Sequence, residues 1–188
     1  MNVRPNLPMS KAAFIEWSAA EDQRFELVAG RVVMMPRLSR SQGLIVSNLV
    51  VALRSRLDPQ QWVVIPEFGL DTGPDSFRYP DVVVDHAGGG AKDYTATSAV
   101  LLAEVLSPSS AEIDLGDKAA EYLQIPSLLA YAVFSQDEPK AWLWERITKH
   151  FTPGPRVISG NEAVLRVAEL KLELPMADIY AGIKITDG

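Results

Sequence analysis

Tyr79-Pro80-Asp81-Val82-Val83-Val84 and Val100-Leu101-Leu102-Ala103-Glu104-Val105-Leu106 are two short apolar segments, each with one acid. Both patterns are typical of buried strands, and the first segment is rich in β-branched residues. An unpaired buried carboxylate is costly, and two carboxylates ~5 Å apart repel by roughly 3 kcal/mol at an effective dielectric of about 20. A divalent cation between Asp81 and Glu104 would remove both costs. The two segments therefore predict a metal-dependent site.

The composition limits which kind of metal site the chain can build. It contains no cysteine and only two histidines, which excludes thiolate sites and histidine-rich sites. A bound metal must rest on carboxylate and carbonyl oxygens, the donors that suit Mg²⁺ or Mn²⁺. The hydrophobic share of 47% and the charged share of 22% are ordinary for a globular chain. We expect one domain over residues 1–188, with an irregular N-terminus over residues 1–9.

The distribution of apolar residues bears on location. No stretch approaches the ~20 apolar residues of a membrane span. Residues 1–5, Met-Asn-Val-Arg-Pro, lack the apolar core of a signal peptide. Together with the absence of cysteine, this favours a cytoplasmic protein without a membrane partner.

The net charge of −6 argues mildly against nucleic-acid binding, but the charge is unevenly distributed. Residues 24–56 contain six arginines and one glutamate, a local balance of +5, so the remainder carries −11. A local basic stripe is enough to follow a phosphate backbone. The alternative interpretation is a solvated face of arginines.

Hydrophobic periodicity and turn residues predict the order of the elements. Helices are expected over 10–20, 41–57, 114–124 and 176–183, and strands over 25–28, 31–35, 62–65, 79–84, 100–106, 129–134, 141–145 and 170–174. This order predicts an α+β (α/β-like) fold in which helices flank a central mixed sheet.

Four residues along this order carry candidate chemistry: Glu26, Asp81, Glu104 and Lys118. A metal held by acids from adjacent strands can polarise a phosphoryl oxygen and lower the pKa of a bound water. A lysine beside it can position that water or stabilise developing charge. Paired carboxylates can also serve a glycosidase, but the chain has few aromatic residues outside apparent core positions to line a sugar cleft.

Several spaced motifs resemble the Uma2 family, formerly a domain of unknown function, within the PD-(D/E)XK nuclease-like superfamily that includes restriction endonucleases. The resemblance covers nearly the whole chain. Its principal motifs are Tyr79-Pro80-Asp81-Val82-Val83-Val84, Glu104-Val105-Leu106-Ser107-Pro108-Ser109, and Asp114-x-Gly116-Asp117-Lys118 with Tyr122; shorter ones lie at residues 25–30, 125–128, 135–139 and 174–176.

The resemblance implies a restriction-endonuclease-like core and a Mg²⁺- or Mn²⁺-dependent endonuclease acting on DNA. Asp81 and Glu104 would bind the metal, and the backbone carbonyl of Val105 would be a further ligand. Lys118 would orient the attacking water, and Glu26 would be a third acid in an outer position. Nucleases of this fold often pair to cut both strands, so a homodimer is expected by analogy, formed through the apolar strand around Trp142.

The chain departs from the usual superfamily pattern at three places. The acid-x-Lys motif places lysine two residues after the acid, where this chain has Leu106, so Lys118 would have to reach in from the following helix. Many relatives have histidine where this chain has Gln42, and Glu-Tyr where it has Ala130-Tyr131. These departures support an alternative: a catalytically inactive nuclease-fold module that binds nucleic acid or a protein.

Each candidate residue also has a structural alternative. Asp81 could be a solvent-exposed residue at the end of a strand, with Glu104 paired to an arginine. Glu26 could face outward and pair with Arg24 or Arg31. Lys118 could form a surface pair with Asp114 one turn earlier on its helix, an interaction of only ~0.3–0.5 kcal/mol.

Overall fold

The computed structural model describes residues 8–106 and 113–183, without the side chains of Ile113 and Asp114. Most of the expected irregular N-terminus, residues 1–7, lies outside this part. The helices are α1 (Lys11–Ser18), α2 (Arg40–Arg54), α3 (Lys118–Tyr122) and α4 (Met176–Ile179), with a π-helical turn over Ile113–Asp117 and a 3₁₀ turn over Ala168–Leu170. The strands are β1 (Phe25–Val28), β2 (Arg31–Met34), β3 (Trp62–Pro66), β4 (Leu70–Gly73), β5 (Ser76–Arg78), β6 (Val82–His86), β7 (Leu101–Val105), β8 (Ala130–Phe134), β9 (Lys140–Ile147), β10 (His150–Phe151), β11 (Arg156–Ser159), β12 (Val164–Val167) and β13 (Leu172–Pro175).

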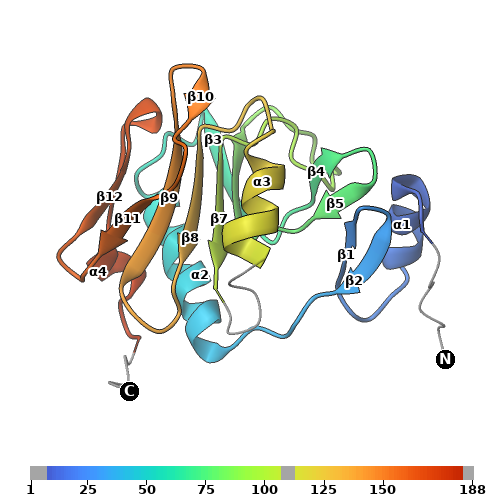
Figure 1. Cartoon of the computed structure of the whole chain (residues 1–188), viewed down its shortest axis with the longest axis horizontal. Coiled ribbons are helices and arrows are strands. Elements are labelled where there is room, and N and C mark those ends of the chain that lie inside the picture. Colours follow the sequence, from blue (N-terminus) through green and yellow to red (C-terminus); the bar gives the residue numbers. More distant parts are fainter. Residues whose placement is uncertain (1–7, 107–112, 184–188) are drawn as a thin grey trace.

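A mixed sheet forms the centre of the molecule, in the strand order β10-β9-β8-β7-β6-β3, with β11 also paired to β9. Strands β7 and β8 are parallel, whereas β6 is antiparallel to both β7 and β3. Helix α2 lies behind this sheet and α3 in front of it in Figure 1. The predicted central mixed sheet flanked by helices is therefore confirmed.

A smaller sheet, in the order β2-β1-β5-β4, lies to one side of the central sheet together with α1 (Figure 1). The β1–β2 hairpin turns through Ala29 and Gly30, whose φ angles of 47° and 76° both lie in the left-handed region. A two-residue hairpin with both φ angles positive matches the right-handed twist of its strands. Phe14 on α1 packs against Phe25, Leu27 and Phe77 of this sheet.

Side-chain alternation places Asp81 and Glu104 on one face of the central sheet. Val82 pairs with Ala103, and both pack in the hydrophobic cluster that includes α2. Val83 pairs with Leu102, and both belong to the cluster on the opposite face, which includes α3. Because successive side chains alternate between faces, Asp81 and Glu104 share the α3 face. The site is therefore built where α3 crosses the sheet.

Helix α2 forms the predicted amphipathic helix on the other face. Ser39 and Gln42 form a capping box at its start, with Gln42 N 3.1 Å from Ser39 Oγ and Ser39 N 3.0 Å from Gln42 Oε1. Ile45, Leu49 and Leu53 are buried against the sheet at helical spacing. This packing provides most of the stability of the helix.

We predict that Leu53→Ala destabilises the protein by about 2–5 kcal/mol, because the truncated side chain leaves a cavity in a close-packed interior. Leu53 is fully buried, whereas Val51 on the same helix is 69% exposed. Val51→Ala is therefore the matched control and should change the free energy of unfolding by no more than about 0.5 kcal/mol. Urea unfolding monitored by tryptophan fluorescence measures both, and equal effects would contradict the assigned packing.

Several boundaries differ from the expectations. Strand β6 begins at Val82, so Asp81 immediately precedes it rather than lying within it. The helix expected over 114–124 consists of a π-helical turn followed by α3, and the terminal helix ends at Ile179. The strands β4, β5, β10, β11 and β12 were not expected. Within residues 8–106 and 113–183, no helix has the length and apolar character needed to cross a membrane.

Candidate functional site

Asp81 is fixed by the backbone of the neighbouring strand. Asp81 is only 9% exposed, and Val105 N donates a 2.7 Å hydrogen bond to Asp81 Oδ2. The carbonyl oxygen of Asp81 also accepts a hydrogen bond from Glu67 N at 3.1 Å. Asp81 is therefore a buried, oriented carboxylate, and the alternative of a solvent-exposed strand end is wrong.

Glu104 is held from above by α3. It is 3% exposed, and its Oε1 atom accepts hydrogen bonds from Lys118 Nζ at 2.9 Å and Tyr122 Oη at 3.0 Å. Lys118 and Tyr122 are four residues apart, so they lie on the same side of the helix. The structure thus brings Lys118 to Glu104, as the sequence analysis requires if this lysine is to stand in for one at position 106.

The carbonyl of Val105 contacts a residue that the sequence analysis noted only as a departure. Gln42 Nε2 donates a 3.1 Å hydrogen bond to Val105 O, and the other end of the Gln42 amide is held in the capping box with Ser39. A carbonyl oxygen has two lone pairs, so this hydrogen bond leaves it able to accept a second partner. Gln42 therefore helps to fix the orientation of the Val105 carbonyl.

Glu26 belongs to a buried charge cluster around Arg78, a residue that is itself 3% exposed. Arg78 Nη1 lies 3.1 Å from Glu26 Oε2, and Tyr79 N donates to Glu26 Oε1 at 3.0 Å. On its other side, Arg78 Nη2 lies 2.6 Å from Glu121 Oε2, and Glu121 also accepts a hydrogen bond from Thr72. The ion-pair partner of Glu26 is thus Arg78 rather than Arg24 or Arg31, and Arg24 pairs with Glu67 instead. Removing one partner from such a buried pair costs about 3–5 kcal/mol.

Burial and neighbouring charges fix the protonation of two groups in the site. Burial opposes the charge on Arg78, but the hydrogen bond to Glu121 and the charges of Glu26 and Glu121 raise its pKa above the ordinary value. Burial raises the pKa of Tyr122 well above its usual range, and the charge of Glu104 raises it further. Arg78 therefore stays charged and Tyr122 stays a hydrogen-bond donor across the neutral range.

Sequence reasoning did not identify Arg78 and Glu121. Arg78 lies between Phe77 and Tyr79, two aromatic residues that pack together on the opposite side with Phe14. The aromatic residues on either side of Arg78 were the sequence feature that could have identified it, because alternation along a strand places Arg78 on the opposite face, toward α3. The alternative partner of Lys118, Asp114, has a side chain outside the described part of the chain.

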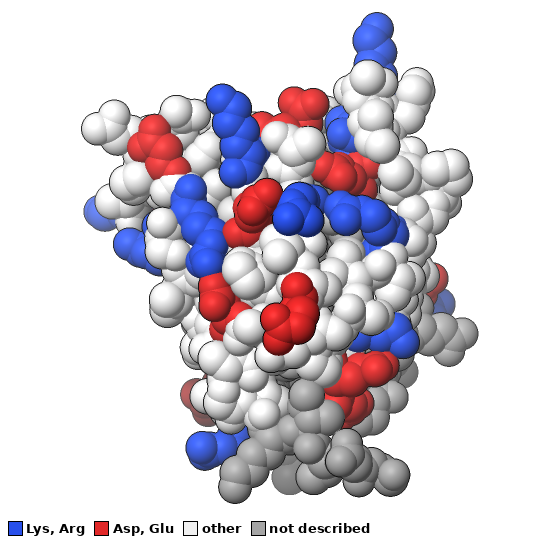
Figure 2. Space-filling model, turned by 90° about the vertical axis from the view of Figure 1, so that its left-hand side faces the viewer, with Lys and Arg blue, Asp and Glu red and all other residues white. Residues whose placement is uncertain are grey.

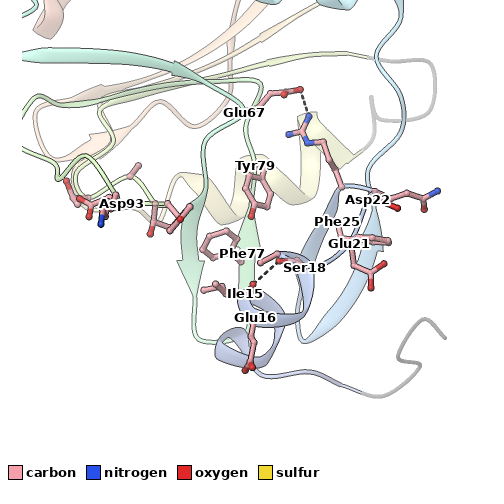
Figure 3. Close-up of a pocket in the computed structure, with 18 residues that line it drawn as sticks. Ile15, Glu16, Ser18, Glu21, Asp22, Phe25, Glu67, Phe77, Tyr79 and Asp93 are labelled. Carbon is pink, nitrogen blue, oxygen red and sulfur yellow. Dashed lines mark hydrogen bonds and ion pairs between the residues drawn. The ribbon is translucent and has the colours of Figure 1, made fainter. Parts of the chain in front are cut away.

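A wide pocket lies beside the site but does not contain its acids. It has a volume of about 1130 Å³ and runs between α1, the residues before β1 and residues 92–97. Tyr79 and Phe77 form part of its wall, and Glu67, Glu16 and Asp93 also line it (Figure 3). Acids outnumber the two basic residues of the lining, Arg24 and Lys92, so the pocket does not have the charge of a phosphate groove.

Comparison with solved structures gives a similar fold. One match is a crystal structure from Anabaena variabilis ATCC 29413, titled "a putative nuclease belonging to DUF820", with a TM-score of 0.79 and 16% sequence identity. The alignment covers 94% of this chain and 100% of that chain. No curated protein matches this chain.

Comparison with protein families matches residues 12–177 to Uma2, a family described as "Putative restriction endonuclease". This range contains Glu26, Asp81, Glu104 and Lys118. It also spans every strand of the central sheet. The chain therefore belongs to the Uma2 family.

Proposed function

We propose that this protein is an endonuclease that hydrolyses DNA phosphodiester bonds with the help of Mg²⁺ or Mn²⁺. The observation that carries the proposal is the placement of Asp81 and Glu104 on one sheet face, with Lys118 Nζ 2.9 Å from Glu104 Oε1. Membership of a family described as "Putative restriction endonuclease" supports it. The nuclease fold of the matched crystal structure supports it as well.

The donor set suits a hard divalent cation. Among the described residues, no group of three or more histidine, cysteine, aspartate or glutamate side chains is placed to hold a metal. The protein ligands would therefore be two carboxylates, Asp81 and Glu104, with the carbonyl of Val105. Mg²⁺ is commonly held by one or two carboxylates together with waters and substrate phosphate, so this set fits it. Such a cation would supply Lewis-acid activation of the phosphodiester.

The formal charges around the site also suit a divalent cation. Glu104 pairs with Lys118, Asp81 lies on the same sheet face as Glu104, and Glu26 and Glu121 flank Arg78. These four carboxylates and two cationic side chains leave two negative charges. A bound divalent cation would neutralise them, which favours its retention where little water reaches the acids.

The chain's own residues have distinct roles in this proposal. Asp81 and Glu104 hold the cation, and the backbone of Val105 keeps Asp81 in position through its N–H group. Lys118 reaches the same carboxylate oxygen as Tyr122, from which it can orient a water or stabilise the charge that develops on phosphate. Glu26 acts at a distance from the reaction through its ion pair with Arg78.

DNA is proposed as the substrate because of the charge of one segment. Residues 27–57 contain five arginines and no acid. Arg31 on β2, Arg37 on the linker after it and Arg40 at the start of α2 are all exposed. Helix α2 also carries Gln42, which contacts Val105. By contrast, the face that carries β11 and β12 shows acidic and basic side chains interspersed (Figure 2), and Arg166 there pairs with Glu173 at 2.9 Å. The arginine segment is therefore the surface proposed to follow the DNA backbone.

We predict that the double variant Arg37→Ala/Arg40→Ala weakens DNA binding and flattens its salt dependence. Each lost phosphate contact should reduce the slope of log K against log salt by about 0.9, giving a reduction of about 1.8. Fluorescence anisotropy in EDTA, with a labelled duplex at several salt concentrations, measures binding without cleavage. Arg156→Ala/Arg166→Ala on the opposite face is the matched control and should leave the slope unchanged. An equal reduction in both variants would contradict the assigned surface.

Nicking of supercoiled plasmid tests the proposed function directly. The wild type should convert plasmid to open-circle and linear forms in Mn²⁺ and should do nothing in EDTA. Activity that persists in EDTA would contradict the metal dependence.

A second function is favoured by one observation: Leu106, which occupies the usual lysine position, is buried in the hydrophobic cluster with Leu102 and Tyr122. A nuclease-fold module that binds DNA without cutting it would tolerate this replacement. Salt-sensitive binding without nicking would support this alternative over the endonuclease.

A further inference from the structure

Arg78 connects two parts of the proposed site, although it is not itself one of the proposed metal ligands. It ends β5, three residues before Asp81, and its guanidinium contacts Glu26 on β1 and Glu121 on α3. The contact with Glu121 uses two nitrogens, with Nε 3.1 Å and Nη2 2.6 Å from Oε2. One buried side chain therefore joins the segment that carries Asp81 to the helix that carries Lys118.

Helix α3 depends on such contacts for its position. It has only five residues, and its N-cap residue, Asp117, makes no side-chain capping hydrogen bond. Isolated helices shorter than about 12–15 residues are marginal in water. Ala119 and Tyr122 pack one side of α3 into the core, while Glu121 fixes it laterally through Arg78 and Thr72.

The helical spacing couples the contacts of Glu121 to the position of Lys118. Glu121 follows Lys118 by three residues and Tyr122 follows it by four, so each is a neighbour of Lys118 on the surface of α3. A shift of Glu121 would therefore move Lys118 Nζ and Tyr122 Oη, which both donate to Glu104 Oε1. The position of the lysine relative to the acid is set through this anchor.

The other arm of the cluster fixes the segment before β6. Glu26 accepts hydrogen bonds from both Arg78 Nη1 and Tyr79 N, which orders the two residues immediately upstream of Pro80 and Asp81. We propose that Arg78 is a positioning residue that sets Lys118 against Glu104 through Glu121 and aligns Asp81 through Glu26. This inference rests on the proposed function, because it assigns Arg78 a task in that same site.

Arginine suits this task better than lysine. A planar guanidinium presents several donors in a fixed geometry and can bind two carboxylates at once, whereas an ammonium is a single point charge. Arg78→Lys should therefore keep the buried charge but fail to hold both Glu26 and Glu121. A wild-type kcat in Arg78→Lys would contradict the proposal that one guanidinium must bind Glu26 and Glu121 at once.

The decisive variant is Glu121→Ala, because Glu121 is 18% exposed and its loss leaves the buried Arg78–Glu26 pair intact. We expect kcat for plasmid nicking to fall about 10- to 100-fold with KM unchanged. This is the effect commonly seen when a residue that hydrogen-bonds to a metal ligand is removed. Glu121→Gln keeps an oxygen that can accept from Arg78 and should recover part of the loss. Glu16→Ala, an exposed glutamate on α1, is the matched control.

A double-mutant cycle shows whether Glu121 acts through the lysine. If it does, Glu121→Ala should cause no further loss of kcat in a Lys118→Met background, because residues that share one interaction are not additive. An equal loss in both backgrounds would overturn the positioning role.

Hydrogen exchange decides the inference independently of cleavage. In Glu121→Ala, the amides of residues 118–123 should exchange about tenfold faster or more, while those of β6 and β7 keep wild-type rates. If the wild type cuts no DNA, the proposed function fails, and exchange alone decides whether the cluster holds α3. Wild-type protection of α3 in Glu121→Ala would overturn the inference in an active and an inactive protein alike.

Discussion

Asp81→Asn is expected to lower Mn²⁺-dependent nicking of supercoiled plasmid at least ~100-fold. A bound metal contributes several kcal/mol of transition-state stabilisation, and about 1.4 kcal/mol corresponds to each tenfold change in rate. Asparagine retains an oxygen that can accept the hydrogen bond from Val105 N, so the variant removes the charge and keeps the local geometry. Calorimetry with Mn²⁺ should show a parallel loss of metal affinity.

The control for this variant lies on the same strand face. Asp85 is four residues further along, is 3% exposed, and accepts hydrogen bonds from Thr97 N at 2.9 Å and Ser98 N at 2.7 Å. Asp85→Asn should therefore lower the melting temperature while leaving the nicking rate at 25 °C unchanged. A wild-type Mn²⁺ affinity in Asp81→Asn would contradict the proposal that Asp81 binds the metal. An equal loss of activity in both variants would indicate a general effect on folding.

The parts of the fold that could be predicted from the sequence are those that depend on residues close together in the chain. The capping residue Ser10 and the Ala29-Gly30 turn mark their helix and hairpin directly, and the helical spacing of Ile45, Leu49 and Leu53 marks α2. The strands around Val83 and Leu102 follow from apolar runs of strand length. Such signals require no knowledge of the rest of the chain.

The missed elements have weaker local signals. Strands β4 and β5 have only four and three residues, and the segment that contains them is rich in turn-forming residues such as Gly73 and Pro74. Strand β12 alternates buried and less buried residues over only four positions, Val164–Val167, and is stabilised by pairing with β13. Their existence depends on partners that the sequence alone does not identify.

Arg78 shows the same limit within the site. Arginine is almost never fully buried unless paired, so an arginine met in a sequence is expected at the surface. Its two partners, Glu26 and Glu121, are 52 and 43 residues away. The pairing therefore emerges only when β1, β5 and α3 are brought together. By contrast, the burial of Asp81 and Glu104 was predictable, because each is an isolated acid in an apolar segment.

Lys118→Met is expected to separate catalysis from metal binding. Lys118 Nζ lies 2.9 Å from Glu104 Oε1, where its charge competes with a cation for the same carboxylate. Removing it should lower kcat ~100-fold, the scale seen when a preorganised group that stabilises transition-state charge is lost, while Mn²⁺ affinity is kept or increased. Asp81→Asn should lose both properties, so the two variants together assign different roles to the acid and the lysine.

The matched control is Lys140→Met, which removes a half-buried lysine paired with Glu138 and should leave kcat and Mn²⁺ affinity unchanged. If Lys118→Met cuts at the wild-type rate, Lys118 is only an ion-pair partner of Glu104, and it does not replace the lysine missing at Leu106. If kcat and Mn²⁺ affinity fall together, Lys118 instead maintains the geometry of Glu104, because loss of a competing charge alone cannot weaken cation binding.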